Sequence, residues 1–130
     1  LSKFVNLTKL NLSDNTNISN FNEVSKLKNL SNLNLEKNNL HGRMIDFSQL
    51  TNLTELNLDN NTLWDEDLVN LKELKNNTNL TIYLRNNAIT NATSLLELDR
   101  STKIYLSGNV NLTRDAQNKL RERFGNNVIF

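Results

Sequence analysis

Few residues of this chain have the chemistry that catalysis needs. The sequence contains one histidine, His41, in the turn-like stretch His41-Gly42-Arg43, and it contains no cysteine. Thiol catalysis, disulfides and cysteine–zinc sites are therefore excluded, and one histidine is too few for a histidine-rich metal site. The sequence also has no phosphate-binding loop and no nucleophile elbow. We therefore expect neither an enzyme nor a bound metal or cofactor, and we interpret His41 as a solvated turn residue.

Two tyrosines and one arginine are better suited to recognising a partner. Tyr83 and Arg85 are two residues apart, and Tyr105 follows Tyr83 by 22 residues. Tyrosine and arginine are enriched among the residues that dominate binding free energies. Three acidic residues precede them and are candidates for an adjoining acidic patch: Glu36, Glu55 and Asp59. Whether these side chains share one surface depends on the elements that carry them.

A repeat of leucine and asparagine supplies those elements. Of the 130 residues, 27 are asparagine and 25 are leucine. The pattern L-x-x-L-x-L-x-x-N spans residues 7–15, 30–38 and 53–61, and shorter copies span residues 82–87 and 104–109. The last leucines of successive copies are 23, 23, 26 and 22 residues apart. Regular spacing of this kind indicates a stack of similar structural units.

These copies resemble the leucine-rich repeat family over nearly the whole chain. The phrase N-L-T-x-L-x-L is most similar to internalin-type repeats of bacterial surface proteins, and it is also similar to short repeats of intracellular phosphatase regulators. The resemblance implies an α/β solenoid. In such a fold the chain forms a right-handed superhelix with a short parallel sheet on its concave face. Residues 1–112 would hold five repeats, the first entered mid-repeat, and residues 113–130 a C-terminal cap helix and a terminal segment.

Each copy predicts one short strand with alternating side chains. The inward positions are apolar: Leu10, Leu33, Leu56, Ile82 and Ile104, each followed two residues later by a leucine. The outward positions form columns across the sheet, and the middle column reads Asn11, Asn34, Asn57, Tyr83 and Tyr105. This register predicts that Tyr83, Tyr105 and Arg85 share the concave face with the three acidic residues. The alternative is that tyrosine merely suits an exposed strand.

A second set of asparagines recurs where each strand ends: Asn15, Asn38, Asn61, Asn87 and Asn109. An inward amide at such a turn can bond backbone groups of its own repeat and of the next one, because it has both donors and an acceptor. We therefore predict a structural asparagine ladder, whereas Asn34 on the concave face should be a surface residue. The alternative for the ladder positions is that they too are surface asparagines.

The segments between strands differ from one another. Apolar spacing predicts a loose helical stripe at residues 21–27, an extended or irregular return at 45–50, a helix at 65–74 and a short helix at 93–98. Met44 and Trp64 are expected to pack on the convex side. Thr113 is a plausible N-cap for a helix that ends before Gly125, with Ala116, Leu120 and Phe124 along one face. We interpret this helix as a terminal cap rather than as a basic membrane- or nucleic-acid-binding helix, and we expect a last extended segment after it.

Composition limits the function further. The net charge is +1, which argues against nucleic-acid binding through bulk charge, and no apolar run approaches the roughly 20 residues of a membrane span. The chain begins within a repeat and lacks an initiator methionine, so we expect a fragment of a longer protein. The predicted function is a monomeric protein-binding module of a bacterial surface or secreted protein. An intracellular regulatory scaffold in the cytoplasm and a spacer between domains are the alternatives, and the partner's identity is open.

Overall fold

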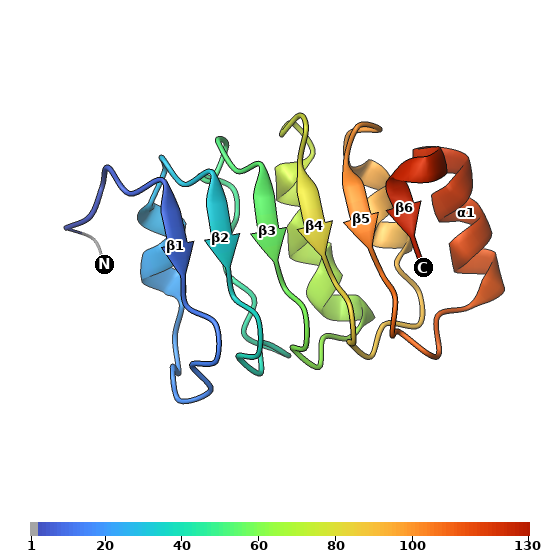
Figure 1. Ribbon diagram of the computed structural model, residues 1–130, viewed down its shortest axis with the longest axis horizontal. Helices are drawn as coiled ribbons and strands as arrows, with labels where there is room; N and C mark the ends of the chain where they lie inside the picture. Colours follow the sequence, from blue (N-terminus) through green and yellow to red (C-terminus); the bar gives the residue numbers. More distant parts are fainter. Residues whose placement is uncertain (1–2) are drawn as a thin grey trace.

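The computed structural model, which describes residues 3–130, is organised around a six-stranded parallel sheet. Each strand pairs with the strand that follows it along the chain, so β1 and β6 are the two edges and the sheet is open (Figure 1). The strands are β1 (Lys9–Asn11), β2 (Asn32–Asn34), β3 (Glu55–Asn57), β4 (Thr81–Tyr83), β5 (Lys103–Tyr105) and β6 (Val128–Ile129). The parallel sheet predicted from the repeat is thus present.

The register aligns equivalent positions of successive copies. Leu10 pairs with Leu33, Leu33 with Leu56, and the row continues through Ile82 and Ile104. From β2 to β5 these inward side chains are at most 1% exposed, whereas Leu10 is only partly buried because β1 has a neighbour on one side alone. We call the opposite, outward-pointing side of the strands the sheet face.

Three helical segments lie behind the sheet (Figure 1): η1 (Asn22–Lys26), η2 (Asp65–Leu74) and η3 (Thr93–Glu97). All three are 3-10 helices, with three residues per turn. Their buried residues recur every three positions, as in Leu68, Leu71 and Leu74 of η2, so the tighter helix places all of them on one face. The segment between β2 and β3 has no helix, as predicted, and buries Ile45, Phe47 and Leu50.

The C-terminal part contains an α-helix, α1 (Arg114–Phe124), followed by the single turn η4 (Gly125–Asn127) and then β6. Thr113 caps α1, since its Oγ1 accepts a hydrogen bond from the Ala116 N–H at 3.2 Å. Ala116, Leu120 and Phe124 are buried, which confirms the predicted apolar face. The last segment pairs with β5 and extends the sheet by one strand beyond the five predicted. Among the helices of residues 3–130, none is long and apolar enough to cross a membrane.

Candidate functional site

The asparagines at the strand ends connect each turn to the next. The Asn38 amide donates to the carbonyl oxygens of Leu12 and Leu35, both at 2.9 Å, and its Oδ1 accepts the N–H of Asn15 at 2.9 Å. In the same way, the N–H of Asn38 donates to Asn61 Oδ1, and the N–H of Asn61 donates to Asn87 Oδ1. Asn38, Asn61 and Asn109 are buried, whereas Asn15, on the edge strand's turn, is exposed. These bonds hold the strand ends, and with them the sheet face, in fixed register.

The residue before each of these asparagines has left-handed backbone geometry. Four of the five are not glycine: Asp14, Lys37, Asn60 and Asn86, with φ between 54° and 59°. The fifth, Gly108, has a φ of 80°, and a Cβ there would lie 2.0 Å from Asn86 Oδ1. A side chain at this last turn, next to the strand that carries Tyr105, would therefore require the exposed Asn86 side chain to move.

On the sheet face, Tyr83 and Tyr105 are direct partners in the β4–β5 register. Their rings stack nearly in parallel, with centroids 4.9 Å apart and an interplanar angle of 10°. Both side chains are partly exposed. The spacing follows from neighbouring strands, which lie about 4.8 Å apart. The structure therefore brings the two predicted tyrosines together as one rigid aromatic surface.

Arg85 completes this cluster, and Asp59 holds it in place. Both Nε and Nη2 of Arg85 contact Asp59 Oδ2, at 2.8 Å and 2.7 Å, while the Arg85 N–H donates to Asp59 Oδ1 at 2.7 Å. Asp59 is only 3% exposed, so its predicted place in an exposed acidic patch is wrong. Its carboxylate is buried because it must satisfy the Arg85 backbone and side chain together.

The role of Asp59 follows from the change of residue in the middle column. In β2 and β3, the Oδ1 atoms of Asn34 and Asn57 accept the N–H two residues ahead, each at 2.9 Å. Tyr83 in β4 has no acceptor that can do this, and Asp59 accepts the corresponding N–H of Arg85 instead. Asn34 therefore lies partly exposed on the sheet face, as expected, and its amide oxygen already accepts a backbone N–H.

The contacts with Asp59 hold the positive charge of Arg85 beside the two tyrosine rings. The Arg85 guanidinium carbon lies 5.1 Å from the Tyr83 ring centroid and 5.7 Å from that of Tyr105, within the range of cation–π attraction. The hydrogen bond that the Arg85 guanidinium donates to Asp59 raises the pKa of Arg85. Burial raises the pKa of the Tyr83 phenol, and the negative charge of Glu55 adds to this effect. The cluster thus presents the neutral phenol of Tyr83 beside a permanent cation.

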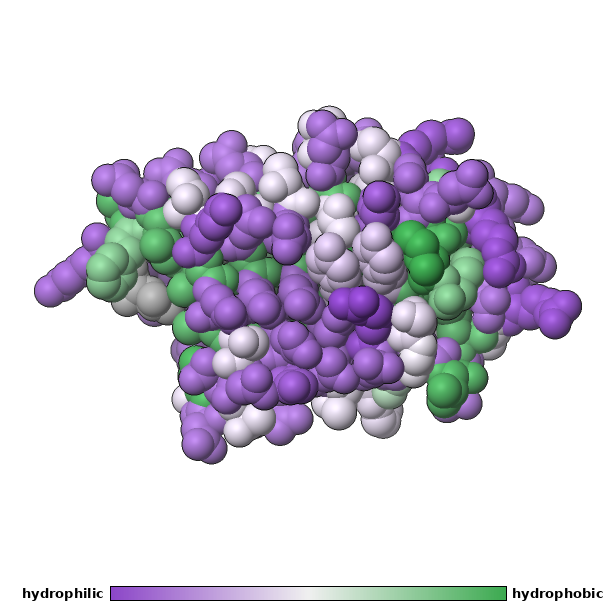
Figure 2. Space-filling view, in the orientation of Figure 1, coloured by the Kyte–Doolittle hydropathy of each residue, from purple (hydrophilic) through white to green (hydrophobic). Residues whose placement is uncertain are grey.

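The two other predicted acidic residues remain on the sheet face, on the side of β2 and β3. Glu36 is partly exposed and accepts a hydrogen bond from the Asn60 amide at 3.1 Å. Glu55 is exposed and accepts one from the Asn32 amide at 3.1 Å. On the other side, Figure 2 shows that the surface over β4 and β5 is less polar and passes into hydrophobic residues over β6. The sheet face therefore changes from polar and acidic to aromatic and apolar along the sheet.

His41 lies behind the sheet as an exposed turn residue, as expected, but its ring has partners on η2 and at Trp64. Its Nδ1 lies 2.8 Å from Asp67 Oδ2, and its ring stacks on Trp64 with centroids 4.8 Å apart. Asp67 is buried and also accepts the N–H groups of Gly42 and Trp64, each at 2.8 Å. The cluster fastens the turn after β2 to the start of η2. The residues involved are separated by 26 positions, a contact that no local pattern indicates.

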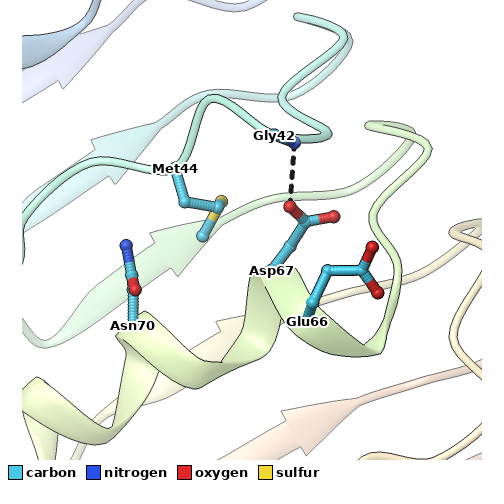
Figure 3. A pocket seen from close by; sticks show the side chains of 5 residues that line it. All are labelled: Gly42, Met44, Glu66, Asp67 and Asn70. Carbon is cyan, nitrogen blue, oxygen red and sulfur yellow. Dashed lines mark hydrogen bonds between the residues drawn. The ribbon is translucent and has the colours of Figure 1, made fainter.

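A shallow pocket of about 180 Å³ adjoins this cluster (Figure 3) and is lined by Gly42, Met44, Glu66, Asp67 and Asn70. Met44 is partly buried there, whereas Trp64 is 51% exposed, so the expectation that both pack on the convex side holds only for Met44. Within residues 3–130, no three histidine, cysteine, aspartate or glutamate side chains cluster as metal ligands would. Asp67 already binds the turn, so the structure gives this pocket no evident chemistry.

No model of a known protein family matches the sequence, and no curated protein matches it.

Proposed function

We propose that the chain is a leucine-rich repeat solenoid of the internalin-like kind and that it binds another protein through the sheet face, the concave side of such solenoids. Support for the solenoid comes from six parallel strands paired in chain order and from asparagines that join successive turns. The bacterial surface or secreted location follows from the sequence resemblance alone, and no reaction is part of the proposal.

One observation carries the binding function, namely the stacked tyrosine pair fixed beside Arg85. Tyr83 and Tyr105 constrain each other by stacking, and Asp59 fixes the guanidinium. Side chains that are already ordered lose little conformational entropy when a partner binds. Tyrosine also offers a large contact area with few rotatable bonds. Preorganised aromatic and arginine residues of this kind are typical of the centres of protein interfaces.

The test begins by identifying what contacts this face. A photo-crosslinking amino acid is introduced in place of Thr81, which lies near Tyr83 on β4, and separately in place of Lys72, which lies on η2 behind the sheet. The proteins crosslinked from the two positions are compared. A protein captured only from the Thr81 position is then purified and titrated against the variants. We expect Tyr83→Ala and Tyr105→Ala each to weaken binding by about 2 kcal/mol, roughly 30-fold.

Asn11→Ala is the matched control, because Asn11 occupies the same column at the opposite edge of the sheet. It should change the affinity less than about twofold. All variants are first compared by thermal unfolding, since loss of the ring stack removes about 0.5–1.5 kcal/mol of stability in addition to the area that the ring buries. Unchanged binding by the Tyr83→Ala/Tyr105→Ala double variant would move the interface away from the sheet face and reject the proposal.

A further inference from the structure

We infer that the tyrosine cluster recognises an extended acidic segment of the partner, with acidic residues at positions i and i+4 and an apolar residue at i+2. This inference rests on the proposed function and specifies the chemistry of the partner at the same site. It follows from the positions of two cations on either side of the tyrosine pair.

The first step is the spacing of these groups along the strands. Lys103 begins β5, two residues before Tyr105, and Arg85 follows Tyr83 by two residues at the other end of β4. In the register, Thr81 pairs with Lys103 and Tyr83 with Tyr105. Two residues of a strand advance the chain by about 6.6 Å. The backbone positions of a cation, an aromatic pair and a second cation thus follow one another in steps of about 6.6 Å along the strand direction. The guanidinium carbon of Arg85 itself lies 5.1 Å from the Tyr83 ring centroid.

The second step is the availability of the two cations. Arg85 contacts Asp59 through Nε and Nη2 alone, and Nη1 has no hydrogen-bond or ion-pair partner in the described part of the chain. The Arg85 side chain is 42% exposed while that of Asp59 is 5% exposed, so the guanidinium is the charge that an approaching group meets. Lys103 is exposed. A guanidinium nitrogen that is free in this way can donate a charge-assisted hydrogen bond to a carboxylate.

The third step is the geometry of the ligand. An extended chain has the same advance per residue as the strands beneath it, and its residues i, i+2 and i+4 point to one side. Carboxylates at i and i+4 can therefore reach Lys103 and Arg85 while the side chain at i+2 packs on the tyrosine pair. The rings are 4.9 Å apart, which leaves no space for a nucleobase to enter between them.

The rest of the sheet face sets where this segment binds. Glu55 on β3 and Glu36 just after β2 occupy the outward positions equivalent to Lys103 and Arg85. Like charges repel, so an acidic segment is excluded from β2 and β3. Lys9 occupies the same column as Lys103 on β1 but has no aromatic residue in the middle column beside it. The matching pattern therefore occurs once among the described strands, over β4 and β5.

The experiment uses a fluorescein-labelled, capped heptapeptide with the sequence glycine, glutamate, threonine, phenylalanine, threonine, glutamate, glycine, titrated against the full chain by fluorescence anisotropy. Comparison peptides carry lysine in place of both glutamates, or place the two glutamates next to each other with unchanged composition. A third has one glutamate and one lysine. We expect the first peptide to bind at least about tenfold more tightly than the lysine or rearranged peptides.

Protein variants then test the pairing itself. Lys103→Glu should weaken the two-glutamate peptide about tenfold and bind the peptide with one lysine more tightly than wild type does. Lys9→Glu is the matched control, with the same charge change in the same column, and should leave both affinities within about twofold. Thermal unfolding checks that both variants fold.

Several results would overturn the inference. Equal binding of the glutamate and lysine peptides would do so, as would an equal loss of affinity with Lys9→Glu or tighter binding of an oligothymidylate. Absence of binding of the first peptide at about 1 mM, which corresponds to a binding free energy of about −4 kcal/mol, would do so as well. The proposed function fails separately, if the tyrosine variants leave the captured partner's affinity unchanged. If the tyrosines matter and the charges do not, protein binding stands and the acidic-segment inference is rejected.

Discussion

Asparagines at the strand ends and asparagines on the sheet face have different structural uses, and they differ in which atoms are bonded. At the strand ends the amide nitrogen donates to carbonyls of two successive turns while the oxygen accepts an N–H. On the sheet face, Asn34 and Asn57 use only the oxygen, which accepts the N–H two residues ahead. The first use joins neighbouring copies and is buried at Asn38, Asn61 and Asn109, whereas the second is local and open to water. Replacement by alanine should therefore have unequal costs.

We expect Asn61→Ala to lower the free energy of unfolding by about 1–3 kcal/mol, because it leaves buried carbonyl and N–H groups without partners. The Asn61 amide donates to the Leu35 carbonyl at 2.9 Å and its oxygen accepts the Asn38 N–H at 2.8 Å. Urea unfolding followed by circular dichroism measures the change. Asn76→Ala, at an exposed position, is the control and should cost less than about 0.5 kcal/mol. Equal costs for the two variants would contradict the role assigned to Asn61.

The raised pKa of Tyr83 gives a second prediction for single residues. The chain has two tyrosines, so Tyr105→Phe keeps an aromatic partner for Tyr83 and leaves it as the only phenol. Its ionisation, followed by ultraviolet absorbance, should have a midpoint above the ordinary value of about 10, because burial and the negative charge of Glu55 disfavour the phenolate. In urea, where the chain is unfolded, the midpoint should return to about 10.

The sign of the effect on stability follows from the same shift. Above about pH 10 the unfolded chain loses the phenolic proton while the folded chain still holds it, so the free energy of unfolding falls as the pH rises toward the folded-state pKa. Below that range the contribution of Tyr83 is fully present. A midpoint of Tyr83 at or below that of the unfolded chain would contradict the partly buried ring stack.

The sequence predicts which face of the sheet these residues occupy, but it does not predict all of their side-chain hydrogen bonds. Tyr83, Tyr105 and Arg85 were placed correctly because the alternation of strand residues and the repeat spacing fix which face each one occupies. The burial of Asp59 depends on a partner 26 residues away that replaces a missing asparagine. The contact of His41 with Asp67 likewise spans 26 residues. Such side-chain pairs depend on the distance between neighbouring copies, which the spacing of apolar residues does not specify.

At the level of the elements, the spacing of buried residues determines the type of helix. Buried residues recur at every third position behind the sheet, as in Ala92, Leu95 and Leu98 around η3, and these segments are 3-10 helices. In α1 the interval is four, through Ala116, Leu120 and Phe124, and this helix is α-helical. The sequence predicts where these helices lie. The interval of three is visible in the sequence, and the structure shows that it accompanies the 3-10 type.

The C-terminal elements close one end of the hydrophobic core. Leu120 and Phe124 of α1 and Val128 of β6 belong to the same buried cluster as Ile104. Deleting residues 113–130 would uncover this apolar surface and leave β5 as an edge strand. We expect a lower melting temperature and self-association, because large exposed apolar patches favour aggregation. Differential scanning calorimetry and light scattering measure both, and an unchanged melt of a monomeric truncated chain would show that these residues are not a cap.

At the scale of the whole molecule, the order of the strands was the most predictable feature. Copies of similar length that each supply one strand stack in chain order, and the structure shows this order. The sixth strand was less predictable, since residues 128–130 carry no copy of the repeat. What places them is α1, which returns the chain to the free edge of β5. The position of β6 therefore follows from the predicted helix α1 and not from the repeat pattern.

Chain-order pairing has a mechanical consequence when the molecule is pulled by its ends. The first and last strands, β1 and β6, are the two edges of the sheet and lie at opposite ends of it (Figure 1). A load applied there pulls an edge strand away from its single neighbour. The hydrogen bonds between the two strands then break one after another (unzipping), whereas under shear loading they would all have to break together. Equivalent residues of β1 and β2 are 23 positions apart, so each detached copy lengthens the tether by about 80 Å. Optical tweezers should record a staircase of low-force steps of about this size, starting at the edge that lacks the α1 cap.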